Sequence, residues 1–257
     1  TLNEMLERLD VSARAQRQFV ADASHELRSP VATIRTLLEV SATVSMDDAE
    51  LRADVIAETA RLERLVTGLL LLARRDAARP AGPVRHESVD LADLVSCEAA
   101  RPRRLPVQVD CRDEALVSGD PDALRTLVGN LLDNAARHAT STVRATVWVA
   151  PDAVVPKPWR PAADVSAPLS DRTARRTVSW AVVTVTDDGV GVPEHERERI
   201  FDRFVRLDEA RTRDAGGAGL GLAISRAIAV DHGGWLACEA VAQGGSFVLL
   251  VPSSTRS

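Results

Sequence analysis

A histidine and a glutamate stand side by side within a long helical pattern, in the segment FVADASHELRSP. His25 lies about 200° around the helix from both Ala23 and Leu27, so it points away from the apolar stripe that they share. A neutral imidazole is nucleophilic near pH 7, and Glu26 beside it can accept a proton or fix the tautomer. Ser29, one turn on, can orient a water against a group bonded to His25. The same pattern also fits an ordinary surface histidine.

Two asparagines one turn apart mark a second segment, LVGNLLDNAARH. Asn130 and Asn134 lie on the border of the apolar face of a predicted helix. Two amide oxygens can ligate a cation without adding charge, which suits Mg²⁺ that keeps several waters and bridges phosphates. Arg137, nearly one turn beyond Asn134, can reach a phosphate. The alternative is that these are border residues bonded to the backbone.

Two glycine-rich segments follow. VTDDGVGVP leaves a strand and turns at Gly189 and Gly191, which puts Asp187 at the strand end, where a carboxylate can bind the amino group of a base. DAGGAGLGLA opens a helix, and its glycines let backbone N–H groups approach an anion. It is not a Walker loop, because no Gly-Lys-Ser/Thr follows. Either segment alone also fits an ordinary loop.

The N-terminal part of the chain predicts two helices. Apolar residues at helical spacing cover residues 2–44, and a nearly heptad pattern runs from Leu51 to Leu72 after a good N-cap at Asp48. A two-helix hairpin with one apolar stripe cannot bury that stripe alone. We therefore expect a homodimeric four-helix bundle; the alternative is a hairpin packed on the rest of its own chain.

Residues 76–86 are rich in Pro, Ala and Gly and break the heptad pattern, which marks a domain boundary. Beyond them the pattern predicts strands and helices in mixed order, and hence an α/β layer domain with a mixed sheet covered on one face by helices. The predicted strands are 107–111, 115–117, 143–149, 178–186, 235–240 and 246–251. The predicted helices are 120–137, 194–204 and 220–230.

An insertion separates two of these strands. Residues 150–176 contain five prolines and no apolar period, and they are longer than a compact domain normally tolerates in a loop. We predict a disordered, exposed insertion that joins two paired strands and is dispensable for catalysis. The alternative is a Pro-rich segment that binds a partner.

The composition excludes several classes of protein. The chain has 257 residues, 45% hydrophobic and 27% charged, which excludes a disordered tail, and its net charge of -5 argues against nucleic-acid binding. Three widely spaced cysteines fit neither a disulfide framework nor a zinc site. No apolar run approaches the roughly 18 residues of a membrane span, and there is no signal peptide. Since the chain begins at Thr1, we expect it to be part of a longer protein.

The order of these segments resembles that of the sensor histidine kinases of two-component systems, from about residue 14 to the C-terminus. FVADASHELRSP resembles the H box, and LVGNLLDNAARHA resembles the N box. DDGVGVP and GAGLGLAIS are similar to the two glycine boxes, and IFDRFVRLD is similar to the F box. LNEMLERLD, before residue 14, is similar to the end of a HAMP relay helix.

The resemblance implies a dimeric kinase core. Residues 1–13 would end a HAMP-like linker helix, 14–76 would form the HisKA dimerisation and histidine phosphotransfer domain, 77–86 a linker, and 87–257 a GHKL-type ATP-binding α/β sandwich with the Bergerat fold. ATP with Mg²⁺ would phosphorylate a histidine, and a partner response regulator would take the phosphoryl group onto an aspartate. Phosphatase activity toward that regulator is also implied. The chain would be the cytoplasmic portion of an inner-membrane or plasma-membrane protein.

The resemblance also assigns roles to residues. His25 would be the phospho-acceptor and Glu26 its general base, while Ser29 stands where the family commonly has a Thr that assists dephosphorylation. Asn134 would ligate Mg²⁺ with Asn130 in support. Arg137 would touch phosphate and Asp187 would bind the adenine amino group. The other implied nucleotide-site residues are His138, Gly189, Gly191, Phe201, Phe204, Arg206, Gly217, Gly219, Leu220 and Gly221.

Three positions depart from the family pattern. Ser29 lacks the methyl group of Thr, which puts the strength of the phosphatase activity in doubt. Ala218 replaces the commoner Thr of the second glycine box, and His138 stands where an aromatic residue often stacks near the nucleotide. Rival interpretations are another ATPase of the same nucleotide fold, which would lack the His25 helix, and a pseudokinase scaffold that only dimerises and docks a regulator.

Overall fold

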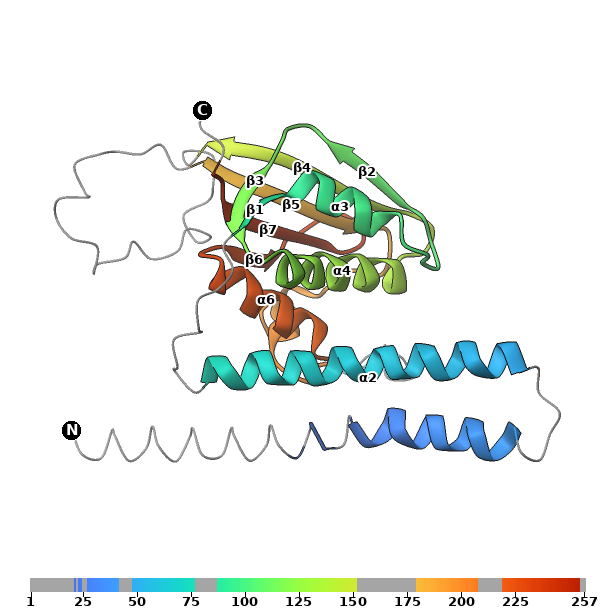
Figure 1. The fold of residues 1–257 in the computed structure, drawn as a ribbon. Coiled ribbons are helices and arrows are strands. Elements are labelled where there is room, and N and C mark those ends of the chain that lie inside the picture. The colour runs from blue at the N-terminus through green and yellow to red at the C-terminus, as the bar shows by residue number, and fades with distance from the viewer. Residues whose placement is uncertain are drawn as a thin grey trace. The chain divides into compact units, whose positions relative to one another are not determined.

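The computed structural model describes residues 21, 23, 24, 27–41, 48–76, 87–151, 179–207 and 219–254. The chain divides into two compact units, one mainly from residues 1–79 and the other mainly from residues 80–213 and 221–257 (Figure 1). The residue limits predicted for the domains stay predictions. His25, Glu26 and most of the insertion predicted at 150–176 lie outside the described residues.

The first unit is a pair of helices. Residues 27–41 are helical, within the predicted 2–44 helix, and α2 (Asp48–Asp76) follows as predicted (Figure 1). Val31 and Leu38, one heptad apart, expose 54% and 52% of their surface, and Ile56 and Leu70, two heptads apart on α2, are also exposed. The hairpin therefore leaves apolar side chains uncovered at heptad spacing.

The second unit is an α/β domain. Its strands are β1 (Glu87–Asp90), β2 (Val107–Cys111), β3 (Leu116–Gly119), β4 (Val143–Pro151), β5 (Ser179–Asp187), β6 (Trp235–Cys238) and β7 (Ser246–Pro252). Its α-helices are α3 (Leu91–Ala99), α4 (Pro121–His138) and α6 (Gly221–Asp231). The 3₁₀ turns η4 (Glu194–Glu196) and η5 (Arg199–Phe201) lie between β5 and α6.

Five strands form one mixed sheet in the order β2-β4-β5-β7-β6, and β1 pairs with β3 in a separate two-stranded sheet. β2 runs parallel to β4, and the other neighbours are antiparallel. Helices α3, α4 and α6 lie on the same face of the large sheet (Figure 1). The predicted α/β layer, with a mixed sheet and helices on one face, is confirmed.

Strand register fixes which residues face the helices. Val143, Ala145 and Val147 of β4 are fully buried, and Val143 lies opposite Asp187, the last residue of β5. The core on this side is mainly aliphatic and includes Phe201 and Phe247, whose rings contact each other. The other sheet face holds a second buried cluster that includes Trp180, with Trp148 and Trp235 packed against it.

The strands that flank the insertion pair as predicted: β4 and β5 are antiparallel, with Pro151 opposite Ser179. Since these residues are neighbours in the sheet, the intervening chain leaves and returns at the same place.

None of the described helices is long and apolar enough to cross a membrane. All three cysteines are free thiols, and burial raises the pKa of the Cys238 thiol to about 11.

One predicted element is wrong. Residues 194–204 do not form a helix, because the chain makes only the turns η4 and η5 and then becomes extended at Asp202. Phe201 is drawn into a ring contact with Phe247, and Phe204 has a positive φ of 62°, which no right-handed helix allows. Tertiary packing here overrides local helix propensity.

Candidate functional site

Helix α4 carries the paired asparagines and has a well-defined start. The side chain of Asp120 accepts hydrogen bonds from the backbone N–H groups of Asp122 (2.9 Å) and Ala123 (3.2 Å), and Pro121 occupies the first turn. The apolar face of the helix is buried. Asn130 and Asn134, on its border, are half-buried.

The asparagine pair lies beside the start of α6. Asn130 Nδ2 donates to the carbonyl oxygen of Gly221 across 3.3 Å, and the buried Ser225 hydroxyl donates to the same oxygen across 2.9 Å. Asn130 therefore fixes the first turn of α6 against α4. The Asn134 side chain makes no hydrogen bond to any residue that the structure describes, so its amide is available to a ligand.

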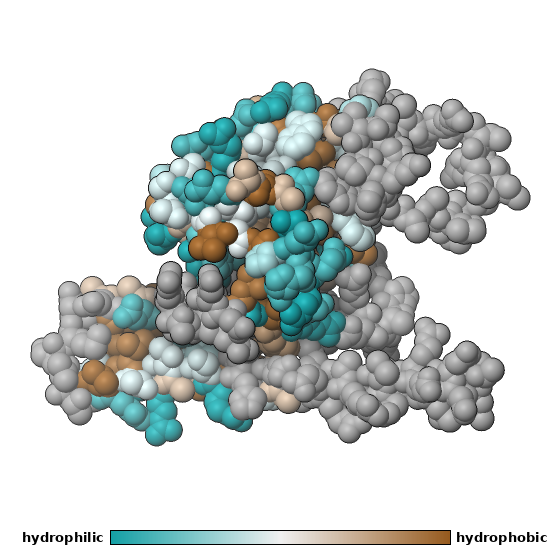
Figure 2. Space-filling view, turned by 180° about the vertical axis from the view of Figure 1, so that it is seen from behind, coloured by the Kyte–Doolittle hydropathy of each residue, from teal (hydrophilic) through white to brown (hydrophobic). Residues whose placement is uncertain are grey.

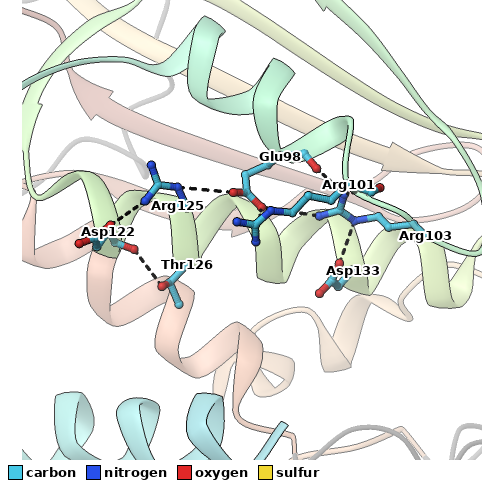
Figure 3. Close-up of polar contacts among 7 residues, drawn as sticks. All are labelled: Glu98, Arg101, Arg103, Asp122, Arg125, Thr126 and Asp133. Atoms are coloured by element: carbon cyan, nitrogen blue, oxygen red, sulfur yellow. Dashed lines mark hydrogen bonds and ion pairs between the residues drawn. The ribbon is translucent and has the colours of Figure 1, made fainter. Parts of the chain in front are cut away.

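Ion pairs hold the side of α4 that faces α3. Glu98, only 1% exposed, lies between Arg125 on one side and Arg101 and Arg103 on the other (Figure 3). Arg103 also pairs with Asp133 at 2.8 Å. Because Asp133 immediately precedes Asn134, this network fixes the helix directly beside the asparagine pair.

A histidine joins the start of α4 to the end of α6. His232 Nδ1 lies 2.7 Å from the carbonyl oxygen of Ile228, and Nε2 lies 3.0 Å from the backbone nitrogen of Asp120. A carbonyl can only accept, so Nδ1 carries the proton and Nε2 accepts from Asp120. A Cβ on Gly119 would lie 2.2 Å from the His232 ring, so this contact requires glycine there.

Asp187 is a buried carboxylate at the end of β5, 7% exposed. Its Oδ1 accepts from the backbone N–H groups of Gly189 (2.9 Å) and Gly245 (3.2 Å). Gly244 passes so close that a Cβ there would lie 1.7 Å from the Asp187 carbonyl oxygen, and its φ of 81° also favours glycine. The carboxylate is thus oriented before any ligand arrives.

The next residue, Asp188, fastens the segment that leaves α4. Its carboxylate accepts from the backbone N–H groups of Thr140, Ser141 and Thr142 at 2.8 to 3.0 Å, and from the Ser141 hydroxyl. These hydrogen bonds, the Ser141 hydroxyl foremost, lower the pKa of Asp188 well below its usual range. Asp188 therefore fixes the end of α4 to the end of β5.

The segment that resembles the F box packs against α6. The Phe201 ring is buried and meets the Phe247 ring edge-on, with centroids 6.4 Å apart and an interplanar angle of 84°. The Arg226 guanidinium lies over the Phe201 ring, 4.8 Å from the ring centroid. Phe204 and Arg206, just beyond, are half-buried.

The remaining predicted site residues are spread over both units. Ser29 is exposed on the helix over 27–41, and Arg137 and His138 are exposed at the end of α4. Gly191 and Gly219 have positive φ values of 79° and 66°, while Leu220 is buried. His25, Glu26 and Gly217 lie outside the described residues.

Sequence reasoning missed three residues that shape this site, Asp188, Gly244 and Gly245. The Asp-Asp and Gly-Gly pairs in the sequence are the only local signals for them. The contact between Gly245 and Asp187 joins residues 58 positions apart, so no local pattern reveals it. Together the described groups can hold a base amino group at Asp187 and a cation or phosphate beside Asn134.

Comparison with known proteins agrees with this arrangement. Residues 119–255 match the family described as histidine kinase-, DNA gyrase B-, and HSP90-like ATPase, and residues 15–78 match the His Kinase A (phospho-acceptor) domain. The second match includes His25. The two matched regions follow the order expected from the sequence motifs.

Individual relatives extend the match over nearly the whole chain. The signal transduction histidine-protein kinase/phosphatase MprB of Mycobacterium avium (strain 104) is 35% identical over 270 residues, which cover 98% of this chain and 46% of that protein. MprB of Mycobacterium tuberculosis (strain ATCC 25177 / H37Ra) is 36% identical over 255 residues, which cover 95% and 45%. The chain thus spans less than half the length of these relatives.

Solved structures give the same fold. The Acinetobacter baumannii histidine kinase AdeS has a TM-score of 0.59 and 18% identity, covering 90% of this chain and 98% of that chain. At this identity the likeness concerns the fold alone. The family matches and the MprB relatives carry the assignment: the chain belongs to the sensor histidine kinases of two-component signal transduction, with a phospho-acceptor domain followed by an ATPase domain.

Proposed function

We propose that the chain uses ATP to phosphorylate His25 and passes the phosphoryl group to an aspartate of a partner response regulator. The observation that carries this proposal is the contact of Asn130 with Gly221, because it brings the N box and the second glycine box together. The phospho-acceptor domain match over residues 15–78 supplies the histidine.

The described residues fit a nucleotide. Asp187 offers a buried, pre-oriented carboxylate for the adenine amino group, and the Asn134 amide has no partner among the described residues. Arg137 and His138 lie at the same end of α4 as Asn134. We assign nucleotide contact to these residues and to Gly189, Gly191, Phe201, Phe204, Arg206, Gly217, Gly219, Leu220 and Gly221.

Asn134, supported by Asn130, is our proposed Mg²⁺ ligand, since a neutral amide oxygen suits a hard cation that also bridges phosphates. ATP bound at these residues would supply the phosphoryl group, and Mg²⁺ would offset its negative charge. The residues of the chain orient the base, the phosphates and the acceptor. We propose that Glu26 takes the proton from His25 and that Ser29 orients a water when the regulator is dephosphorylated.

We propose a homodimer. The exposed heptad positions Val31, Leu38, Ile56 and Leu70 leave apolar surface that a second copy can cover. Figure 2 shows hydrophobic, brown side chains at the surface of the described part of the hairpin. Burial of such a stripe between two hairpins gives a four-helix bundle. The homodimer proposal predicts that the chain dimerises as its concentration rises and that it does so without nucleotide.

The membrane location is also a proposal. The similarity of residues 1–13 to the end of a HAMP relay helix supports a parent protein anchored in the inner or plasma membrane, with this chain as its cytoplasmic portion. Phosphatase activity toward the regulator is proposed with it, since the MprB relatives are named kinase/phosphatase.

Incubation with ATP labelled at the γ-phosphate tests the function. The proposal predicts a phosphoryl group on the chain that is labile in acid and stable in base, as a phosphohistidine is. ATP hydrolysis without a labelled chain would favour an ATPase of the same fold. A chain that dimerises but neither binds nor hydrolyses ATP would favour a pseudokinase scaffold.

A further inference from the structure

We infer that Arg226 is a positioning residue for ATP binding, which holds the F-box turn against helix α6. This inference rests on the proposed function. Arg226 lies in α6, five residues after Gly221. Its guanidinium carbon is 4.8 Å from the centroid of the Phe201 ring and 5.3 Å from that of Trp235. Nη1 pairs with Glu198 Oε2 at 2.8 Å.

One side chain therefore joins three parts of the domain. Phe201 belongs to η5, Trp235 begins β6, and Glu198 immediately precedes η5. The Arg226 side chain is only 26% exposed, so these contacts are partly shielded from water. A planar guanidinium can lie against two aromatic rings and still donate in its plane to a carboxylate. Lys lacks the planar group, and Gln lacks the positive charge.

The location of this contact links it to ATP. Phe201 and Gly221 are both residues to which we assign nucleotide contact. Asn130 of α4 holds the carbonyl oxygen of Gly221 at the start of α6. Arg226, on the same helix as Gly221, contacts the Phe201 ring. Arg226 therefore fixes Phe201 relative to Gly221, so that both residues are in place before ATP binds.

A merely structural role makes a different prediction. If Arg226 only fills the space between Phe201 and Trp235, its replacement lowers thermal stability but leaves the nucleotide affinity of the folded protein unchanged. If it positions the F-box turn, the affinity for ATP falls even where the variant is fully folded. A step that does not use the ATP site, transfer from phosphorylated His25 to a regulator, is unchanged in either case.

The test uses Arg226→Gln, Arg226→Lys and Glu198→Gln, with Arg199→Gln as the matched control. Arg199 lies in the same turn and pairs with Glu196, but it is 62% exposed and contacts neither aromatic ring. ATP affinity is measured by calorimetry on the full chain, together with the KM and kcat of autophosphorylation. Thermal unfolding of each variant identifies the temperature at which all are folded.

We expect Arg226→Gln to weaken ATP affinity and raise KM roughly fivefold or more, which is the loss expected if the variant keeps the F-box turn in position only about a fifth of the time. Arg226→Lys and Glu198→Gln should show smaller losses of ATP affinity in the same direction, and Arg199→Gln none.

Since Glu198 is 73% exposed, its variant folds even if Arg226→Gln does not. Wild-type affinity in both Arg226→Lys and Glu198→Gln, or in folded Arg226→Gln, would overturn the inference. A wild-type chain that binds ATP without phosphorylating His25 contradicts the proposed function instead, and the affinities still decide the role of Arg226.

Discussion

The side-chain amide of Asn130 donates to the backbone carbonyl oxygen of Gly221, 3.3 Å away and 91 residues later in the sequence. The Ser225 hydroxyl, one turn further along α6, donates to the same oxygen. The first carbonyl of α6 is therefore held both by α4 and by its own helix. This gives the two asparagines of α4 different roles. Asn130 uses its amide nitrogen to hold the start of α6. The Asn134 side chain has no hydrogen-bond partner among the described residues, and we propose that it binds the ligand.

Asn134→Ala should therefore remove Mg²⁺-dependent nucleotide binding while the dimer survives. We expect ATP affinity in the presence of Mg²⁺ to fall roughly tenfold or more, with little change when Mg²⁺ is withheld. Calorimetric titrations with and without Mg²⁺ measure this, and light scattering follows the dimer. Normal binding of Mg-ATP by the variant would show that the metal ligand is assigned to the wrong residue.

Two glycines should respond oppositely to alanine. At Gly129, within α4, the nearest atom to an added Cβ is Glu98 Oε2 at 3.5 Å, so Gly129→Ala should stabilise the domain by about 0.5 to 1 kcal/mol. At Gly244 the added Cβ would lie 1.7 Å from the Asp187 carbonyl oxygen, at a φ of 81°. Gly244→Ala should cost about 2 kcal/mol or more.

Urea unfolding of the two glycine variants beside the parent measures both effects. The pair is informative because the same methyl group is added at each position. Equal destabilisation by both substitutions would mean that the approach of Gly244 to Asp187 is not as close as described.

Alkaline pH should weaken the fold through Cys238. Burial raises the pKa of its thiol from the ordinary 9.0 to about 11. Between these values the unfolded chain loses the proton first, so the free energy of unfolding falls as pH rises from about 9 toward 11. The chain has no Tyr, and Lys157 is its one lysine, so few other groups titrate in this range.

Comparing the parent with Cys238→Ala by urea unfolding at several pH values isolates this contribution. The variant should lose less stability than the parent over that pH range. Parallel curves for the two proteins would contradict the raised thiol pKa. The exposed Cys97 and Cys111 remain in both proteins and cancel in the comparison.

The insertion should be removable. Because Pro151 and Ser179 are partners in neighbouring antiparallel strands, a short Gly-Ser turn can connect them directly. We expect autophosphorylation by the shortened chain to stay within about threefold of the parent, since loop length contributes little to stability. The control replaces residues 152–178 by a Gly-Ser segment of equal length. Loss of ATP binding in both variants would show that the insertion contributes to the domain.

Much of this fold follows from local patterns. The Asp120 cap and the proline after it place the start of α4, and apolar alternation places β5 to within one residue. The pattern does not indicate β1 and α3, because four and nine residues carry little periodicity. It indicates a helix over 194–204 where the chain forms turns, because the packing of Phe201 on Phe247 depends on residues far along the chain.

The same limit applies to the site. Residue types predicted Asn130 and Asp187, yet their partners, Gly221 and Gly245, lie 91 and 58 positions away. The ion pair of Arg226 with Glu198 likewise depends on the fold, since it joins a helix to a turn that precedes it by 28 residues. The roles of His25 and Glu26 remain predictions, because both lie outside the described residues.

The most direct test of the account is a single titration of His25→Gln with labelled ATP, in which nucleotide affinity and phosphoryl incorporation are both measured. The two-domain division predicts that the variant binds ATP as tightly as the parent and incorporates no acid-labile phosphoryl group. Loss of ATP binding would contradict the separation of acceptor and nucleotide site. A variant that still acquires an acid-labile, base-stable phosphoryl group would show that His25 is not the acceptor.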